Sequence, residues 1–340
     1  MERNPTADLL KGLAVIFMIQ VHLLELYATP DIYASLIGKV SLFMGGPPAA
    51  PVFMVVMGFY FAMSKKSWIS GIKRGVKLIL LGFILNIGLN THLFIKIANG
   101  SIIVSPWPYL FGVDILFLAG LSIIILSVLK HYFKFNMLPY LFLLASIFAG
   151  QLFLYPISSV EPIHYLLAYV FGDGIWWSYF PLIPWLAYPA LGFILYILKD
   201  RFAELYQKFR LPLLLISGVV SFIFIGYGAD IAASLPGYYH HGVLFFLYTC
   251  VFLIFYSIIV DIISNTKKTW FSRWVAWLGE NVTAAYVIQW LLIGNITTAI
   301  YRTQGYVQLI SWFTIILILV SVGIFCWLGI KKYIDIKASN

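Results

Sequence analysis

Long apolar runs separated by short polar segments make up nearly the whole chain. A helix that crosses a membrane needs about 20 mostly apolar residues. Ten runs of that kind lie at roughly 9–28, 46–64, 72–90, 107–129, 137–155, 180–198, 211–230, 241–263, 276–300 and 307–330. The pattern predicts an all-α polytopic membrane protein with about ten transmembrane helices, folded as a single domain over residues 1–340.

The composition supports a membrane protein. Hydrophobic residues make up 62% of the 340 positions and charged residues 10%, whereas a soluble domain is about 45–50% apolar and about 25% charged. A water-soluble fold and a disordered chain are therefore both excluded. The two cysteines, Cys250 and Cys326, lie inside apolar runs. They form neither a disulfide framework nor a zinc-binding spacing, so no metal is expected.

The distribution of basic residues predicts the orientation. The chain has 22 lysines and arginines against 13 acidic residues, a net charge of +9. If the N-terminus is cytoplasmic, all the basic residues except Lys39, Lys96 and Arg302 fall on the cytoplasmic side, as membrane proteins prefer. Both termini are then cytoplasmic, and the positive charge does not imply nucleic-acid binding. The absence of a soluble domain suggests a bacterial inner membrane.

The first apolar run carries ionisable side chains on one helical face, because positions three and four apart share a face. These positions are Asp8, Lys11, Val15, Met18, His22 and Glu25. Lys11 and His22 are about three turns apart, roughly 16 Å along the axis. Lys11 could hold the phosphates of a cytoplasmic donor, and His22 could act as general base, with Glu25 beside it. The alternative is a structural histidine bonded to a neighbouring helix.

Asp114 lies near the outer end of the fourth run, at about the same predicted depth as His22. A carboxylate at that depth needs a partner. Asp114 could orient the imidazole and stabilise its protonated form, or it could instead bond backbone groups or water.

Other polar residues within the apolar runs are candidates for substrate binding. Asn86 and Asn90 share a face of the third run, and Tyr286 and Gln289 share a face of the ninth. Intramembrane amides also serve simply to hold helices together.

A basic cluster lies around the start of the third run and consists of Lys65, Lys66, Lys73, Arg74 and Lys77. It could bind an anionic cytoplasmic ligand or lipid headgroups. It could also be an orientation signal alone.

Five segments resemble those of transmembrane acyltransferases. They are DLLKGLA at 8–14 running on to His22, APVFMVVMGF at 50–59, DIL at 114–116, PLIPWL at 181–186 and LGEN at 278–281 running on to Tyr286. They are similar to segments of the acyltransferase-3 family and of the family of heparan-α-glucosaminide N-acetyltransferase and its bacterial relatives. The resemblance implies a ten-helix core that takes an acyl group from cytoplasmic acyl-CoA. The group would pass to a glycan or amino sugar on the far side.

The resemblance also implies roles for individual residues. The acyltransferase-3 pattern of arginine, ten residues and histidine becomes Lys11, ten residues and His22. Lys11 and the basic cluster (Lys73, Arg74 and Lys77 within it) would hold the CoA phosphates of acetyl-CoA or another acyl-CoA. His22 would deprotonate the acceptor. The late-span histidine common in that family appears here as Gln289, which implies a single-histidine mechanism.

Two rival functions remain at this stage. A proton-coupled transporter or lipid-linked sugar flippase would use the same buried ionisable residues as a proton relay, although the chain shows no internal repeat of the kind common in transporters. A non-catalytic lipid-binding scaffold is the other. For an acyltransferase the expected partners are acyl-CoA, a glycan or amino-sugar acceptor and membrane lipids, with no nucleic acid. The chain could also form a homodimer.

Overall fold

Helices make up almost all of the computed structural model, which describes residues 4–153, 161–172, 176–266 and 269–339. Within these ranges the only β-structure is two isolated bridges, Ala28 with Gln304 and Val113 with Ser178. The prediction of an all-α polytopic fold is confirmed.

In the described part of the chain, six helices are long and apolar enough to cross a membrane, and the number rises to eight if each of two bent helix pairs counts as one span. The six lie at Pro5–Tyr27, Leu36–Met63, Ile115–Phe133, Val243–Ser264, Val282–Ile300 and Tyr306–Ile334. The bent pairs are Trp68–Leu89 with Thr91–Ala98, at 56°, and Leu182–Ile197 with Lys199–Ile223, at 81°. Met137–Gln151 is a shorter apolar helix. Each of the ten predicted runs therefore falls on helix, but fewer of them form one long straight span.

The contacts divide the described chain into two compact units, each built from separate stretches of sequence. The first comprises Met1–Ala49, Gly88–Val104 and Ile259–Asn340, and the second Ala50–Ile87 and Ser105–Ile258. The prediction of a single domain stays a prediction.

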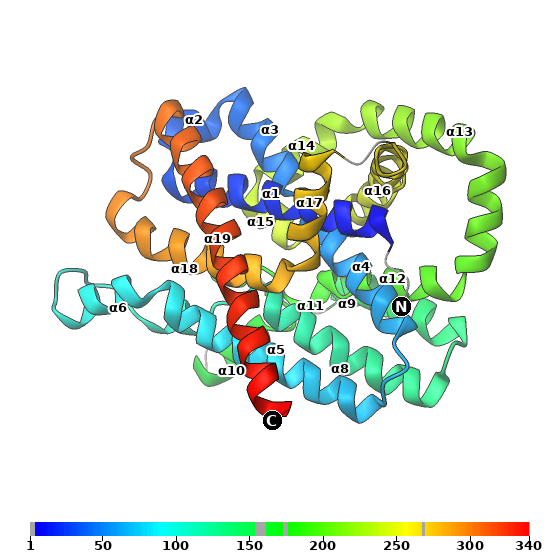
Figure 1. Cartoon of the computed structure of the whole chain (residues 1–340), viewed down its shortest axis with the longest axis horizontal. Helices are drawn as coiled ribbons and strands as arrows, with labels where there is room; N and C mark the ends of the chain where they lie inside the picture. Colours follow the sequence, from blue (N-terminus) through cyan, green and yellow to red (C-terminus); the bar gives the residue numbers. More distant parts are fainter. Residues whose placement is uncertain (1–3, 154–160, 173–175, 267–268, 340) are drawn as a thin grey trace. The chain divides into compact units, whose positions relative to one another are not determined.

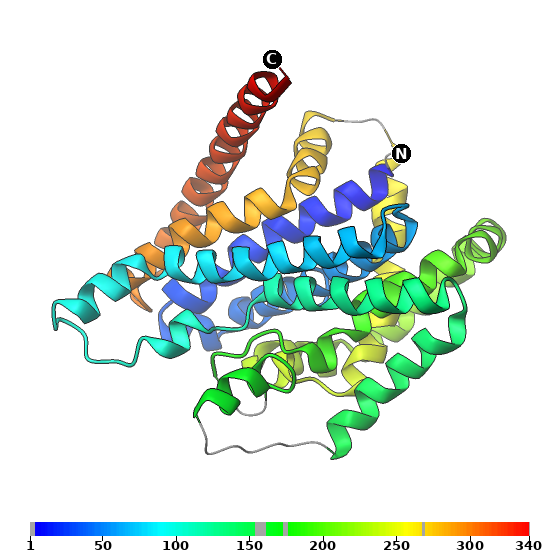
Figure 2. The same cartoon turned by 90° about the horizontal axis from the view of Figure 1, so that it is seen from below.

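The first unit is organised around α1 (Figures 1 and 2). Its helices are α1 (Pro5–Tyr27), α2 (Pro30–Ala34), α3 (Leu36–Gly45), α6 (Thr91–Ala98), α17 (Trp270–Glu280), α18 (Val282–Ile300) and α19 (Tyr306–Ser339). Helix α1 packs against α17, α3, α18 and α19, and in Figure 2 the blue α1 runs beside the orange α18.

Two local features of the sequence place α1. Asn4 caps its N-terminus by accepting hydrogen bonds from the backbone N–H groups of Thr6 and Ala7, as Asn does well. Gly12 on α1 and Gly279 on α17 then allow close approach of the two helices. A Cβ at Gly12 would overlap the carbonyl oxygen of Val275, and one at Gly279 would overlap a backbone carbonyl of α1. Small residues of this kind are typical of membrane helix interfaces.

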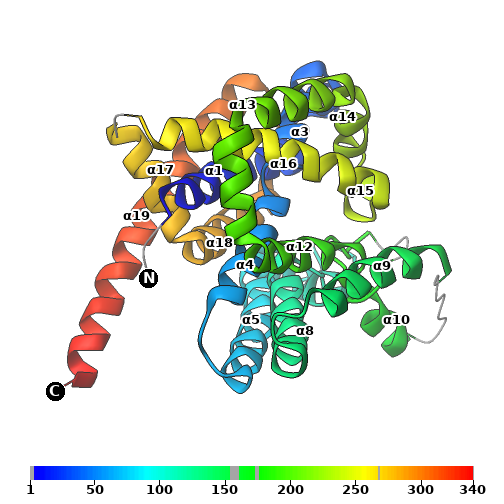
Figure 3. The ribbon, with the colours of Figure 1, turned by 90° about the vertical axis from the view of Figure 1, so that its right-hand side faces the viewer.

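The second unit contains the remaining helices. They are α4 (Ala50–Met63), α5 (Trp68–Leu89), α7 (Trp107–Leu110), α8 (Ile115–Phe133), α9 (Met137–Phe153), α10 (Glu161–Ala168), α11 (Leu182–Trp185), α12 (Ala187–Ile197), α13 (Lys199–Ile223), α14 (Ile225–Ala233), α15 (Leu235–Tyr239) and α16 (Val243–Ser264), of which α5 and α16 end in the first unit. Helices α4 and α12 lie side by side (Figure 3). Gly58 and Gly192 permit this contact, because a side chain at either would overlap a carbonyl oxygen of the other helix.

Candidate functional site

The imidazole of His22 packs against an aromatic side chain of α18. Its ring centroid lies 4.1 Å from that of Trp290, and the two planes are tilted by 37°. Helices α1 and α18 also meet further along, where the Tyr27 hydroxyl donates to the carbonyl oxygen of Ile293 at 3.2 Å. The position of His22 is therefore set by the contact between α1 and α18.

Polar atoms of His22, Trp290 and the residue before Trp290 are buried without hydrogen bonds. Among the described residues, no partner is found for Nδ1 of His22, for Nε1 of Trp290, or for either side-chain polar atom of Gln289. Gln289 is fully buried. Native proteins satisfy most buried polar atoms, so an unsatisfied set at one place is a candidate for binding something polar.

Two other predicted site residues, Glu25 and Tyr286, lie close in sequence to His22 and Trp290. Glu25 follows His22 by three residues on α1 and is partly buried. Tyr286 is buried on α18, and its ring centroid lies 6.5 Å from that of Trp290. The catalytic role of Glu25 and the substrate-binding role of Tyr286 stay predictions.

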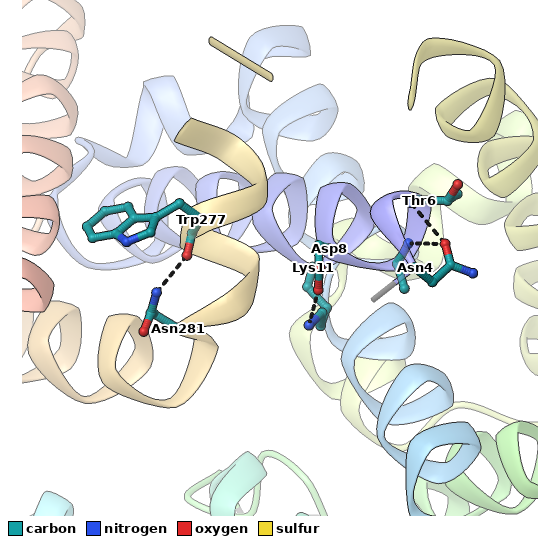
Figure 4. Close-up of polar contacts among 7 residues, drawn as sticks. Asn4, Thr6, Asp8, Lys11, Trp277 and Asn281 are labelled. Carbon is teal, nitrogen blue, oxygen red and sulfur yellow. Dashed lines mark hydrogen bonds and ion pairs between the residues drawn. The ribbon is translucent and has the colours of Figure 1, made fainter. Parts of the chain in front are cut away.

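Lys11 is paired with a residue of its own helix. Its Nζ lies 2.8 Å from the carboxylate Oδ1 of Asp8, one turn earlier, and both side chains are largely buried (Figure 4). A pocket of about 240 Å³ beside Asp8 is also lined by Glu280 and Arg273. The acidic side chains make this smaller pocket an unfavourable place for phosphate groups.

A larger pocket of about 530 Å³ in the second unit carries most of the predicted basic cluster. We call it the basic pocket. None of its described lining residues is acidic, and it includes four serines. Its basic and imidazole side chains are Lys66, Lys73, Arg74, Lys77, Lys130 and His131. Lys65 of the predicted cluster does not line it. Such a set of donors suits a ligand with several phosphate oxygens.

Lys130 is held in place by the end of α4. Its Nζ donates to the carbonyl oxygens of Ala62 at 2.8 Å and Ser64 at 2.7 Å. The C-terminal carbonyls of a helix attract a cation. Lys130 therefore fixes α8 to the end of α4, which forms one wall of the basic pocket.

An aromatic pair lies at the same pocket. The rings of Trp68, which begins α5, and His131, near the end of α8, are stacked with centroids 4.7 Å apart and planes 23° apart. Both side chains remain exposed. Exposed ring faces beside basic groups suit a ligand with a flat aromatic base as well as phosphates.

Asp114 caps helix α8. Its carboxylate Oδ1 accepts the backbone N–H of Leu116 at 2.8 Å and that of Phe117 at 3.3 Å. The sequence left open that Asp114 bonds backbone groups, and in the structure its carboxylate does so as the N-cap of α8. Its predicted second function, orienting His22, stays a prediction.

Both candidate asparagines form hydrogen bonds with nearby backbone groups. The amide of Asn86 donates to the carbonyl oxygens of Leu110 at 3.0 Å and Gly112 at 2.8 Å, which ties α5 to the segment before α8. Asn90 lies between α5 and α6, and its carbonyl accepts the N–H of Phe94. Their substrate-binding roles stay predictions.

Sequence reasoning missed Trp290, Trp68, Lys130 and His131. A tryptophan in an apolar run gives no signal of its own, because it is equally common in packing and at membrane interfaces. Lys130 and His131 lie far in sequence from the basic cluster, and only the packing of α8 on α4 and α5 brings them to the pocket. In the described part of the chain, no group of three or more His, Cys, Asp or Glu side chains could hold a metal ion.

Comparison with known proteins identifies the family. A family model described as an acyltransferase domain, that of the acyltransferase-3 family, matches residues 4–330. The chain belongs to the acyltransferase-3 family. No curated protein and no solved structure matches it significantly. The matched residues include helices of both units. The family and the apolar helices together show that the protein is a membrane acyltransferase.

Proposed function

We propose that this acyltransferase uses acyl-CoA, most simply acetyl-CoA, as its donor. The observation that carries the proposal is the basic pocket, where lysines and an arginine lie beside an exposed aromatic pair and no described lining residue is acidic. Acyl-CoA is the class of acyl donor with several phosphates and an adenine base on one molecule. A volume of about 530 Å³ also falls within the common range for small-molecule sites, about 300–1,000 Å³.

Within this proposal, Lys73, Arg74 and Lys77 bind the donor phosphates. These residues occupy the first turns of α5, and the spacing of Lys73 and Lys77 places both on one face of that helix. Trp68 and His131 offer a ring face to the adenine. The predicted topology, with most basic residues and both termini in the cytoplasm, puts the donor on the side where acyl-CoA is made.

His22 is the proposed general base. It removes the proton from a hydroxyl or amine of the acceptor as the acceptor attacks the acyl carbonyl carbon. The carbon–sulfur bond then breaks, and the departing CoA sulfur takes the proton back from the imidazole. An imidazole Nδ1 buried without a hydrogen bond in the described structure supports a role beyond packing. Glu25 and Asp114 remain the proposed acidic partners of this histidine.

We further propose that the acceptor is a glycan or amino sugar on the extracytoplasmic side of a bacterial inner membrane. Support comes from the predicted depth of His22 near the outer end of α1 and from the family. Asn86, Asn90, Tyr286 and Gln289 are the proposed acceptor-binding residues. Membrane lipids would surround the protein, and association as a homodimer is compatible with the proposal.

Equilibrium binding of radiolabelled acetyl-CoA to the purified full chain in detergent tests the donor. We expect saturable binding that weakens as ionic strength rises. We expect Arg74→Ala to weaken it about tenfold, because charge-assisted hydrogen bonds contribute about 1.5–3 kcal/mol. Arg201→Ala removes the same charge from an exposed position on α13 outside the pocket and serves as the matched control.

The outcomes separate the rival functions. Binding that the Arg74 variant weakens and the Arg201 variant leaves unchanged supports the donor site. Equal weakening by both variants would mean non-specific attraction to positive charge. Absence of binding by acetyl-CoA and by longer acyl-CoAs would reject the proposed donor, and proton-coupled uptake into proteoliposomes without CoA would then favour the transporter.

A further inference from the structure

The strongest unexplained feature of the first unit is the group formed by His22, Gln289 and Trp290. Four polar atoms of these three side chains are buried, and none has a hydrogen-bond partner among the described residues. Gln289 and Trp290 are consecutive on α18, so their Cα atoms differ by only about 1.5 Å along the helix axis. Trp290 packs on His22, and Gln289 lies at almost the same height on α18 as Trp290.

We propose that Trp290 and Gln289 supply N–H donors to the carbonyl oxygen of the acyl group as it accepts negative charge. This inference rests on the proposed function, since it deepens the chemistry of the reaction assigned to His22. The indole Nε1–H of Trp290, whose ring contacts the proposed base, and the amide Nε2–H of Gln289, which immediately precedes Trp290 on α18, are both buried and have no hydrogen-bond partner in the described structure. Donors buried away from water stabilise a developing oxyanion strongly, because they need no reorganisation.

The proposed reaction step forms one bond to the acyl carbon and breaks another. The acceptor oxygen or nitrogen forms a bond to the acyl carbon, its proton passes to His22, and the carbonyl π electrons move onto the carbonyl oxygen. The two N–H groups bind that oxygen in the tetrahedral intermediate. When the electrons return, the carbon–sulfur bond breaks, and the CoA thiolate leaves with the proton from His22.

Trp290 has a second effect through its ring. With centroids 4.1 Å apart, its π face lies close enough to attract the positive charge that His22 gains. In this respect Trp290 is a positioning residue for His22. Replacement by phenylalanine removes the pyrrole ring with its N–H and keeps one aromatic ring for the contact with His22, which separates the two effects.

The distinguishing property of an oxyanion donor is that it binds the transition state more tightly than the ground state. The probe is therefore a pair of ligands: acetyl-CoA and a trifluoromethyl ketone analogue of it, whose hydrate resembles the tetrahedral intermediate. Dissociation constants of both are measured for the full-length wild type, Trp290→Phe and Gln289→Met in detergent. Trp312→Phe is the matched control, because the indole of Trp312 already donates to Gln304 at 3.3 Å.

We expect the wild type and Trp312→Phe to bind the analogue more tightly than acetyl-CoA. Trp290→Phe and Gln289→Met should each lose about tenfold or more of analogue affinity and keep their acetyl-CoA affinity within about twofold. Gln289→Met retains the Trp290 ring, so it tests the donor set even if Trp290→Phe fails to fold.

Equal losses for the two ligands would overturn the inference and leave both residues as ground-state binding or packing residues. Unchanged affinities for both ligands would also overturn it. If the wild type binds neither ligand, the acyl-CoA proposal itself fails, and the inference fails with it. Failure of the acyl-CoA proposal is therefore recognised from the wild type alone, and failure of the inference from a ratio of the two dissociation constants that the variants leave unchanged.

Discussion

The ammonium group of Lys11 lies 2.8 Å from the carboxylate of Asp8, its neighbour one turn away on α1 (Figure 4). The sequence pattern suggested a cation at this end of α1 that could hold donor phosphates. In the structure, that cation is already compensated by a carboxylate. The basic pocket, with no acidic residue among its described lining, is the better site for phosphates.

Lys11→Ala therefore has a defined expected effect on donor binding. We expect its acetyl-CoA affinity to stay within about threefold of the wild type, because Lys11 is already paired with Asp8 and does not line the basic pocket, so its removal takes no charge away from the donor phosphates. Equilibrium binding in parallel with Arg74→Ala measures it. A tenfold loss in the Lys11 variant would show that Lys11 leaves Asp8 to bind the donor, as the sequence pattern predicts.

Replacement of His22 separates chemistry from donor binding. His22→Gln keeps a polar side chain of similar size and removes the base. We expect acyl transfer to fall by about 10²–10⁴-fold, the usual contribution of a general base, with acetyl-CoA affinity unchanged. Acetylated product formed by whole cells and by purified protein would be compared with the wild type. His92→Gln is the control, because the ring of His92 already contacts the carbonyl oxygen of Asn295 at 3.1 Å. Near-normal transfer by His22→Gln would reject the assignment.

Two substitutions of Asp114 separate its capping of α8 from its predicted effect on His22. Asn is as good an N-cap as Asp, whereas Ala is not. We therefore expect Asp114→Asn to keep the wild-type thermal stability and Asp114→Ala to lose about 1 kcal/mol. Unfolding followed by circular dichroism in detergent measures both. If the asparagine variant is stable but transfers acyl groups far more slowly, the charge of Asp114 has the predicted second function. Wild-type activity in that variant would leave Asp114 as a cap alone.

The helical architecture was predictable because the membrane imposes it. A chain with so many apolar runs must satisfy its backbone hydrogen bonds internally, and helices do so within each run. The positions of the two bends were also predictable, because the runs at 72–90 and 180–198 end close to the breaks after Leu89 and Ile197. Their angles, 56° and 81°, were not predictable, because hydropathy does not record the direction in which the next helix leaves.

The candidate site was predictable only in part. His22 and Arg74 stand out because an ionisable residue inside an apolar run is unusual. Trp290 and Trp68 do not, because aromatic residues are common throughout this sequence. Their ring centroids lie 4.1 and 4.7 Å from those of His22 and His131, closer than Trp185 lies to His241 or Trp177 to His164. Such contacts depend on which helices pack together.

The closeness of α1 and α17 gives a final prediction about stability. At Gly279 an added methyl group would overlap the backbone carbonyl oxygen of Asp8, and backbone cannot move aside as a flexible side chain does. We expect Gly279→Ala to lose about 1–3 kcal/mol through overpacking and to lower the midpoint of thermal unfolding in detergent by several degrees. Gly329→Ala on α19 is the matched control, because nothing lies within 4 Å of a Cβ there. It should be neutral or slightly stabilising, since alanine favours helix over glycine by up to about 1 kcal/mol. Equal stability of the two variants would contradict the close contact of α1 with α17.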